Sequence, residues 1–143
     1  MLKPITAFQV IGAPVGKGRP KFARRGNFVQ AYTPTKTKDY EALVQDAAKS
    51  AMGEKSPCSQ AVHMNVEIYV TPPVSWSKKK RTAALEGVVR PTTKPDIDNV
   101  IKGIFDAIND IVFLDDKQVV SLSVMKSYAE QARVVVRAYE IFK

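Results

Sequence analysis

Acidic residues gather in the stretch KPDIDNVIKGIFDAINDIVFLDDKQVV (residues 94–120) of a chain that is strongly basic overall. Asp96 and Asp98 flank a single isoleucine, and Asp115 and Asp116 are adjacent. Mg²⁺ prefers oxygen ligands, and one or two carboxylates with substrate phosphate oxygens are a usual set. One or two such ions can activate water and stabilise the leaving oxygen when a phosphodiester is cut. The stretch therefore has the residue types for metal-dependent phosphate chemistry.

Hydrophobic periodicity predicts an amphipathic helix over residues 96–109. At about 3.6 residues per turn, Asp98, Lys102 and Asp106 share one face with Asn109. Five apolar residues share the other face: Val100, Ile101, Ile104, Ala107 and Ile108. The ammonium of Lys102, one turn from Asp98, is placed to orient a water molecule or to neutralise charge that develops on a phosphate.

Each acid also has an ordinary structural explanation. Asp96 is well placed to be the N-cap of the helix. Asp98 and Lys102 can form an i,i+4 surface pair, which contributes about 0.3–0.5 kcal/mol. Asp115 and Asp116 can belong to a turn. Alternatively, a short return through residues 110–114 brings this pair back beside the helix start, so spacing alone leaves both interpretations open.

Positive charge is concentrated in two other parts of the chain, whose formal net charge is +8. Residues 1–40 contain many Lys and Arg residues and only Asp39 as an acid. A second cluster begins at Lys78–Arg81 and extends to Lys94, with only Glu86 opposing it. Positive fields of this kind attract polyanions, and nucleic acid is the commonest of them. A generic solvated basic surface is the alternative.

The other elements follow from periodicity and from the positions of glycine and proline. The predicted order is strand, helix, strand, helix, strand, strand, at residues 5–11, 36–52, 62–70, 96–109, 120–124 and 133–141. Residues 12–28 are predicted to be a basic, glycine-rich loop, followed by a short strand at 29–32. A short basic helix is predicted near residues 75–87, and the last two strands are expected to pair as a hairpin. This order indicates one domain, residues 1–143, of the α+β or mixed α/β class.

Several protein classes are not expected. No apolar run approaches the ~18 residues that a membrane span needs. The N-terminal segment lacks the small-residue cleavage site of a signal peptide. The single cysteine, Cys58, cannot form an internal disulfide, which fits a reducing compartment. We therefore expect a cytoplasmic protein with no membrane partner.

Taken together, these residues resemble the RusA family of Holliday-junction resolvases, small endonucleases found in phages and prophages. The resemblance is close from Asp96 to Val120, in the form D-x-D-N-x-x-K-x-x-x-D-A, a loop, and D-D-x-Q-V-V. The segments GKGRPKFARRG and AYTPTKTKDYE are similar to the N-terminal parts of the Gram-positive and phage branch. The resemblance implies a single α+β domain, with a mixed β-sheet and two main helices, that forms a homodimer.

The resemblance also implies roles for individual acidic residues and for one lysine. Asp96, Asp98 and Asp116 match the essential metal-binding acids of the family. Lys102 matches its catalytic lysine. Asp115 stands next to the third acid and could share its role.

Further positions concern the contact with DNA. The N-terminal loop of the family contacts DNA, which implies a role here for Lys17, Gly18, Arg19 and Lys21. The family pattern often has a basic residue directly before the first aspartate, whereas this chain has Pro95 there, preceded by Lys94. Phe105 and Trp76 each have two interpretations, contact with an unstacked base or packing within the protein.

The predicted function is a Mg²⁺-dependent endodeoxyribonuclease, with Mn²⁺ as a second candidate ion, that resolves four-way DNA junctions in recombination and repair. A junction has near two-fold symmetry, and a two-fold homodimer supplies two equivalent sites for paired symmetric nicks. The alternatives are a nuclease of broader branched-DNA specificity, a non-catalytic junction-binding protein, and a module whose basic face binds an acidic protein. Metal-dependent nicking separates the enzymes from the non-catalytic alternatives.

Overall fold

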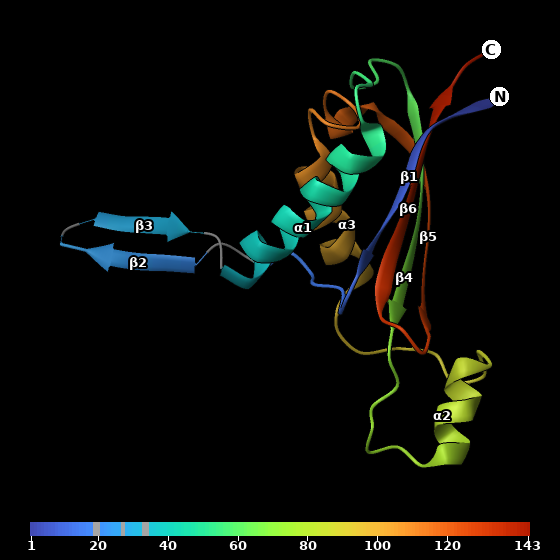
Figure 1. Ribbon diagram of the computed structural model, residues 1–143. Helices are drawn as coiled ribbons and strands as arrows, with labels where there is room; N and C mark the ends of the chain where they lie inside the picture. Colours follow the sequence, from blue (N-terminus) through green and yellow to red (C-terminus); the bar gives the residue numbers. More distant parts are fainter. Residues whose placement is uncertain (19–20, 27, 33–34) are drawn as a thin grey trace.

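Two helices cover one face of a four-stranded β-sheet in the computed structural model, which describes residues 1–18, 21–26, 28–32 and 35–143 (Figure 1). The spatial order of the strands is β1 (Leu2–Ile11), β6 (Arg133–Ile141), β4 (Val62–Val70) and β5 (Val119–Tyr128). The covering helices are α1 (Thr35–Met52) and α3 (Ile97–Ile108). Strand β6 is antiparallel to β1 and β4, whereas β5 runs parallel to β4. The prediction of an α+β domain with a mixed sheet and two main helices is confirmed.

The predicted hairpin between the last two strands is wrong, because β4 lies between β5 and β6. The inward side chains of β4 explain its central position, since all four are fully buried: Val62, Met64, Val66 and Ile68. The chain leaves β5, and Ala129 donates a backbone hydrogen bond to the carbonyl of Val70 at the end of β4. It then returns as β6 on the far side of β4. Placing the fully buried β4 in the centre of the sheet, paired on both sides, therefore outweighs the local tendency of consecutive strands to pair.

The predicted loop at residues 12–28 contains a strand. Strand β2 (Lys21–Arg25) pairs in antiparallel register with β3 (Phe28–Tyr32), which matches the predicted short strand. Gly26 follows β2 with φ of 61°, a conformation that glycine adopts at no steric cost. This two-stranded ribbon projects from the body of the molecule (Figure 1). The dense basic and glycine content of the segment concealed the strand from sequence reasoning.

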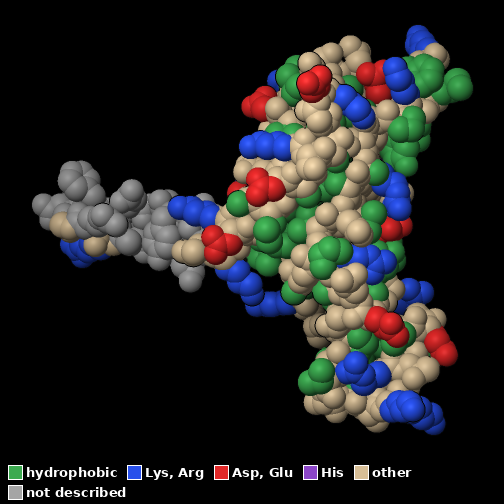
Figure 2. All heavy atoms as spheres, in the orientation of Figure 1, with side chains coloured by type: hydrophobic (Ala, Val, Ile, Leu, Met, Phe, Trp, Pro, Cys, Tyr) green, Lys and Arg blue, Asp and Glu red, His purple; other side chains and the backbone are tan. Residues whose placement is uncertain are grey.

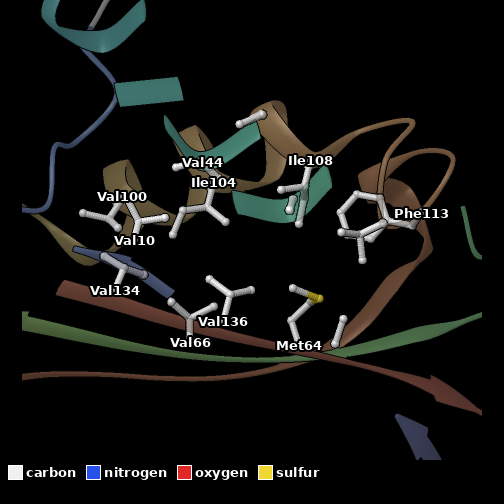
Figure 3. Packing of buried hydrophobic residues seen from close by; sticks show 14 of the residues in the cluster. Val10, Val44, Met64, Val66, Val100, Ile104, Ile108, Phe113, Val134 and Val136 are labelled. Carbon is white, nitrogen blue, oxygen red and sulfur yellow. The ribbon is translucent and has the colours of Figure 1, made fainter. Parts of the chain in front are cut away.

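The core lies between the helices and the inner face of the sheet (Figure 3). The helices at residues 36–52 and 96–109 were predicted correctly to within one residue at each end. Gly53, with φ of 58°, follows the last residue of α1. The labelled side chains of the core come from both helices, from three strands and, for Phe113, from the turn after α3: Val10, Val44, Met64, Val66, Val100, Ile104, Ile108, Phe113, Val134 and Val136.

A third helix, α2 (Lys78–Leu85), lies beyond the end of the sheet (Figure 1). The side chain of its N-cap, Ser77, accepts a hydrogen bond of 3.2 Å from the backbone of Lys80. Trp76 packs edge-on against Tyr128, with ring centroids 5.5 Å apart, and the ammonium of Lys80 lies 3.9 Å from the centroid of its ring. Trp76 is therefore packed within the protein. No helix among the described residues is long and apolar enough to cross a membrane.

The packing of α3 predicts a large difference between two substitutions that remove similar side-chain volumes. Ile104 is 1% exposed and Leu43 on α1 is 53% exposed. We expect Ile104→Ala to lower the free energy of unfolding by about 2–5 kcal/mol, because it removes buried methyl groups and leaves a cavity. Leu43→Ala should change it by less than about 0.5 kcal/mol. Urea titrations of both variants measure these values, and equal effects would contradict the described core.

Candidate active site

Helix α3 presents its first acidic residues to solvent because its apolar face is buried. Asp96 occupies the N-cap with φ of −72° and ψ of 142°, yet its carboxylate makes no capping hydrogen bond. Asp98 is exposed in the first turn. Val100 and Ile104 on the opposite face are each 1% exposed, which fixes the rotation of the helix. The cap position of Asp96 therefore does not explain why this residue is an acid.

Of the other two ordinary explanations, the turn at Asp115 and Asp116 is present, since the backbone N–H of Asp115 donates to Gln118 Oε1 at 2.8 Å, whereas the i,i+4 pair involves a different acid. The ammonium of Lys102 donates to Asp106 Oδ2 at 3.2 Å rather than to Asp98. The carboxylate of Asp115 lies 3.9 Å from the ammonium of Lys117. By contrast, none of the three acids that the resemblance assigns to metal forms an ion pair with a described residue: Asp96, Asp98 and Asp116.

A tight return brings Asp116 back to α3. The backbone of Asp110, at φ of 64°, donates to the carbonyl of Phe113 at 2.8 Å, and Phe113 is fully buried. Asp116 then begins a short 3₁₀ helix, η1 (Asp116–Gln118). Burial raises the pKa of Asp116, and the carboxylates of Asp115 and Asp106 raise this pKa further.

The charges that act on Asp116 show which part of α3 it faces. Asp106 and Lys102 both influence its pKa, the lysine in the opposite direction. Asp116 therefore lies within the range of the charges of Lys102 and Asp106, near the middle of α3.

The acidic residues do not form a closed metal cage. Among the described residues, no group of three or more His, Cys, Asp or Glu side chains is arranged to hold a metal ion. The available donors are nevertheless carboxylate oxygens, which suit Mg²⁺. This ion commonly keeps several waters and takes one or two carboxylates together with substrate phosphates, so an open donor set fits its chemistry.

Lys17, which the resemblance assigned to DNA contact, has surroundings that the sequence did not predict. Its ammonium lies 2.7 Å from Asp106 Oδ2 and 3.1 Å from Glu41 Oε1, and its side chain is 24% exposed. Burial alone would lower the pKa of Lys17, but its hydrogen bond to Asp106 and its ion pair with Glu41 outweigh this effect and raise the pKa. Burial alone would raise the pKa of Asp106, and the hydrogen bonds from Lys17 and Lys102 instead hold it below its ordinary value.

Sequence reasoning placed Asp106 on the polar face of α3 but did not connect it with Lys17, and it did not select Glu41. Lys17 and Asp106 are 89 residues apart in the sequence. No local pattern joins such distant residues. Opposite charges in two segments that both carry family motifs were the only available signal.

Two of the remaining predicted DNA-contact residues, Gly18 and Lys21, lie around the base of the β2–β3 ribbon. The backbone of Gly18 donates to Thr37 Oγ1 at 3.2 Å, Lys21 is the first residue of β2, and Arg19 lies outside the described residues. A groove of about 730 Å³ lies beside this segment and includes Lys36, Lys94 and Asp96 in its lining. Figure 2 shows basic side chains near the base of the ribbon.

Phe105 belongs to the edge of the core. Its ring meets that of Phe113 edge-to-face, with centroids 6.1 Å apart at 86°. Phe105 is partly buried and packs against the main hydrophobic cluster. Of its two interpretations, packing within the protein is the one that the structure shows.

The lowered pKa of Asp106 predicts how stability depends on pH. Ionised Asp106 stabilises the fold above its ordinary pKa of 3.8, and this stabilisation is lost as pH falls through the lower pKa of the folded state. We expect Asp106→Asn to lower the free energy of unfolding at pH 7 by about 1–3 kcal/mol, with the difference shrinking below about pH 4. Urea titrations at several pH values test this, with Asp46→Asn on the exposed side of α1 as the control. A difference from the wild type that does not change with pH would contradict the role of the carboxylate.

Comparison with known proteins agrees with this arrangement. The chain matches the family described as "Endodeoxyribonuclease RusA" over residues 12–139, which include α3, η1 and the N-terminal segment. It is also similar to the uncharacterized protein YqaN of Bacillus subtilis (strain 168), with 42% identity over 136 residues that cover 94% of this chain and 95% of YqaN. The match spans β4, β5, most of β6 and every acid discussed above, and the chain belongs to the RusA endodeoxyribonuclease family.

Proposed function

We propose that this nuclease resolves Holliday junctions by paired symmetric nicks, with Mg²⁺ or Mn²⁺ as its metal ion, in DNA recombination and repair. One observation carries the proposal. Asp96, Asp98 and Asp116 have no cationic partner among the described residues, whereas the neighbouring Asp106 and Asp115 are engaged by lysines. Unpaired carboxylates at a basic surface are available for a divalent cation.

The proposed roles follow from charge and exposure. Asp96, Asp98 and Asp116 would hold the ion, which supplies an activated water and neutralises charge on the phosphate when bound. The side chain of Lys102 is 67% exposed, so its ammonium can reach a phosphate or a water beside it. The negative charges that crowd Asp116 favour a cation at this position.

Helix α2 would hold one duplex arm of the junction. Two of its four consecutive cations have structural contacts, since Lys80 covers the ring of Trp76 and Arg81 donates to the carbonyl of Pro73 at 3.0 Å. Lys78 and Lys79 are exposed, and neither forms an ion pair with a described residue. The basic side chains around α2 are visible in Figure 2. The packing of Trp76 thus holds α2 in place, and the exposed Lys78 and Lys79 on this helix are available to contact phosphates.

The proposal includes a homodimer that acts in the cytoplasm. Paired nicks require two equivalent active sites at opposed positions of the junction, and a two-fold dimer of this chain supplies them. Salt should weaken binding steeply, because each phosphate contact releases counterions from the DNA.

The first test compares a labelled four-way junction that has a short mobile core with a linear duplex of the same sequence. Each is incubated with the protein and Mg²⁺, Mn²⁺ or EDTA, and the products are separated on a denaturing gel. We expect paired symmetric nicks in the junction alone, and only with a metal ion. Asp96→Asn should lower the nicking rate at least about 100-fold and leave junction affinity intact, because it removes a ligand charge without removing positive surface.

The matched control is Asp46→Asn, which makes the same chemical change at an exposed position of α1 and should nick at the wild-type rate. Junction binding without nicking in either metal would favour the non-catalytic alternative. Nicks in flaps or other branched DNA at equal rates would favour the broader nuclease.

The role of α2 is tested separately by the salt dependence of binding. We expect Lys78→Ala combined with Lys79→Ala to weaken junction binding and to reduce the slope of log K against log salt by about 2, near 0.9 for each lost phosphate contact. Gel-shift titrations between low and moderate salt measure the slope. Lys3→Ala, in β1 near the opposite end of the sheet, should leave it unchanged. An unchanged slope in the double variant would remove α2 from the DNA interface.

A further inference from the structure

The N-terminal segment that precedes the β2–β3 ribbon is held against α3. The backbone N–H of Lys17 donates to the carbonyl of Asn99 at 2.9 Å. A Cβ atom at Gly16 would lie 3.0 Å from the Cβ of Asn99, so a larger residue would push the segment away from the helix. Gly103, on the same side of α3, lies under the side chain of Lys17. A Cβ atom added at Gly103 would lie 3.6 Å from the Cβ of Lys17. The backbone of Lys17 therefore has a defined position on α3.

From this position the side chain of Lys17 reaches a carboxylate that also holds Lys102. Asp106 Oδ2 accepts hydrogen bonds from Lys17 at 2.7 Å and from Lys102 at 3.2 Å. Glu41 on α1 provides a second acidic contact for Lys17 at 3.1 Å. The side chains of Lys17, Asp106 and Glu41 are 22–24% exposed, whereas that of Lys102 is 67% exposed. Three members of this network are thus enclosed, and one reaches into solvent.

We propose that Asp106 is a positioning residue, which is itself fixed by Lys17 and holds the ammonium of Lys102 in place on the exposed side of α3. This inference rests on the proposed function, in which Lys102 acts on the phosphate of the DNA. Lys17 then has a different role from the phosphate contact that the family resemblance implies. It joins the segment at the base of the DNA-contact ribbon to the centre of the active site.

The contact between Lys102 and Asp106 keeps Lys102 from pairing with the acids proposed to hold the metal ion. Lys102 lies one turn after Asp98 on α3, on the side of the helix that carries the acids proposed to hold the metal ion. A long, flexible lysine beside these unpaired carboxylates would pair with one of them and occupy oxygens needed for a metal ion. Asp106 offers a competing carboxylate that is already fixed. An isolated i,i+4 pair on a helix surface is weak, but the second lysine and the partial burial of Asp106 give this one a defined geometry.

The test compares Asp106→Asn, Asp106→Glu and Lys17→Met with the control Asp46→Asn. Thermal unfolding is measured first, so that all assays run well below the midpoint of every variant. Single-turnover nicking rates at saturating protein are then compared with junction affinities from gel shifts.

We expect Asp106→Asn to lower the nicking rate about 10–100-fold, the range seen when a supporting residue is lost, and to leave the junction affinity within about twofold of the wild type. Asp106→Glu should recover part of the rate because it keeps the charge. Lys17→Met should lower the rate less, and it should add little to Asp106→Asn.

A second readout does not depend on cleavage. The ¹⁵Nζ resonance of Lys102, assigned by its absence in Lys102→Met, is recorded without DNA or metal. We expect Asp106→Asn and Lys17→Met to shift or broaden it, and Asp46→Asn to leave it unchanged. A wild-type resonance in Asp106→Asn, or wild-type nicking by that variant, would overturn the inference and leave the proposed function standing. Absence of nicking by the wild-type protein in either metal would overturn the proposed function, and with it the catalytic meaning of the contact.

Discussion

The burial of one face of α3 against the sheet determines which of its residues can act. Ile104 and Ile108 pack into the same cluster as Met64 and Val136 from the sheet (Figure 3). A helix held on that side can present only its opposite side to solvent, and this side carries the acids and Lys102. Because tight packing resists rotation of the helix, the spacing of polar residues along α3 becomes a fixed arrangement of charges in space.

The charges on that surface are divided into two kinds. Lys17, Glu41 and Asp106 are partly enclosed and paired with one another, so their charges are compensated within the protein. Asp98 and Asp116 have no such compensation among the described residues. Burial raises the pKa of Asp116, and the nearby carboxylates of Asp115 and Asp106 raise this pKa further, so the ionised form of Asp116 is disfavoured. Residues that are unfavourable for stability in this way often mark functional sites, where a ligand supplies the missing charge.

Positive charge is also found away from this acidic centre, on two other elements. The β2–β3 ribbon projects from the body of the molecule, and α2 lies beyond the end of the sheet (Figure 1). Both elements lie outside the main core, and both carry lysine or arginine residues. Under the proposed function, an extended polyanion would contact these basic elements while one of its phosphates lies at the acids. The proposal thereby gives a reason for a basic protein to concentrate carboxylates in one stretch.

The sequence alone determined the elements that depend on local periodicity: α1, α3, β4, and the motif that identifies the family. The resemblance to the family also implies metal-binding roles for Asp96, Asp98 and Asp116, which stay predictions. Only the tertiary structure decided that β4 separates β5 from β6, that β2 pairs with β3, and that Lys17 joins Asp106. These features depend on contacts between residues far apart in the chain, and their energies come from burial and charge compensation that no local window of sequence contains.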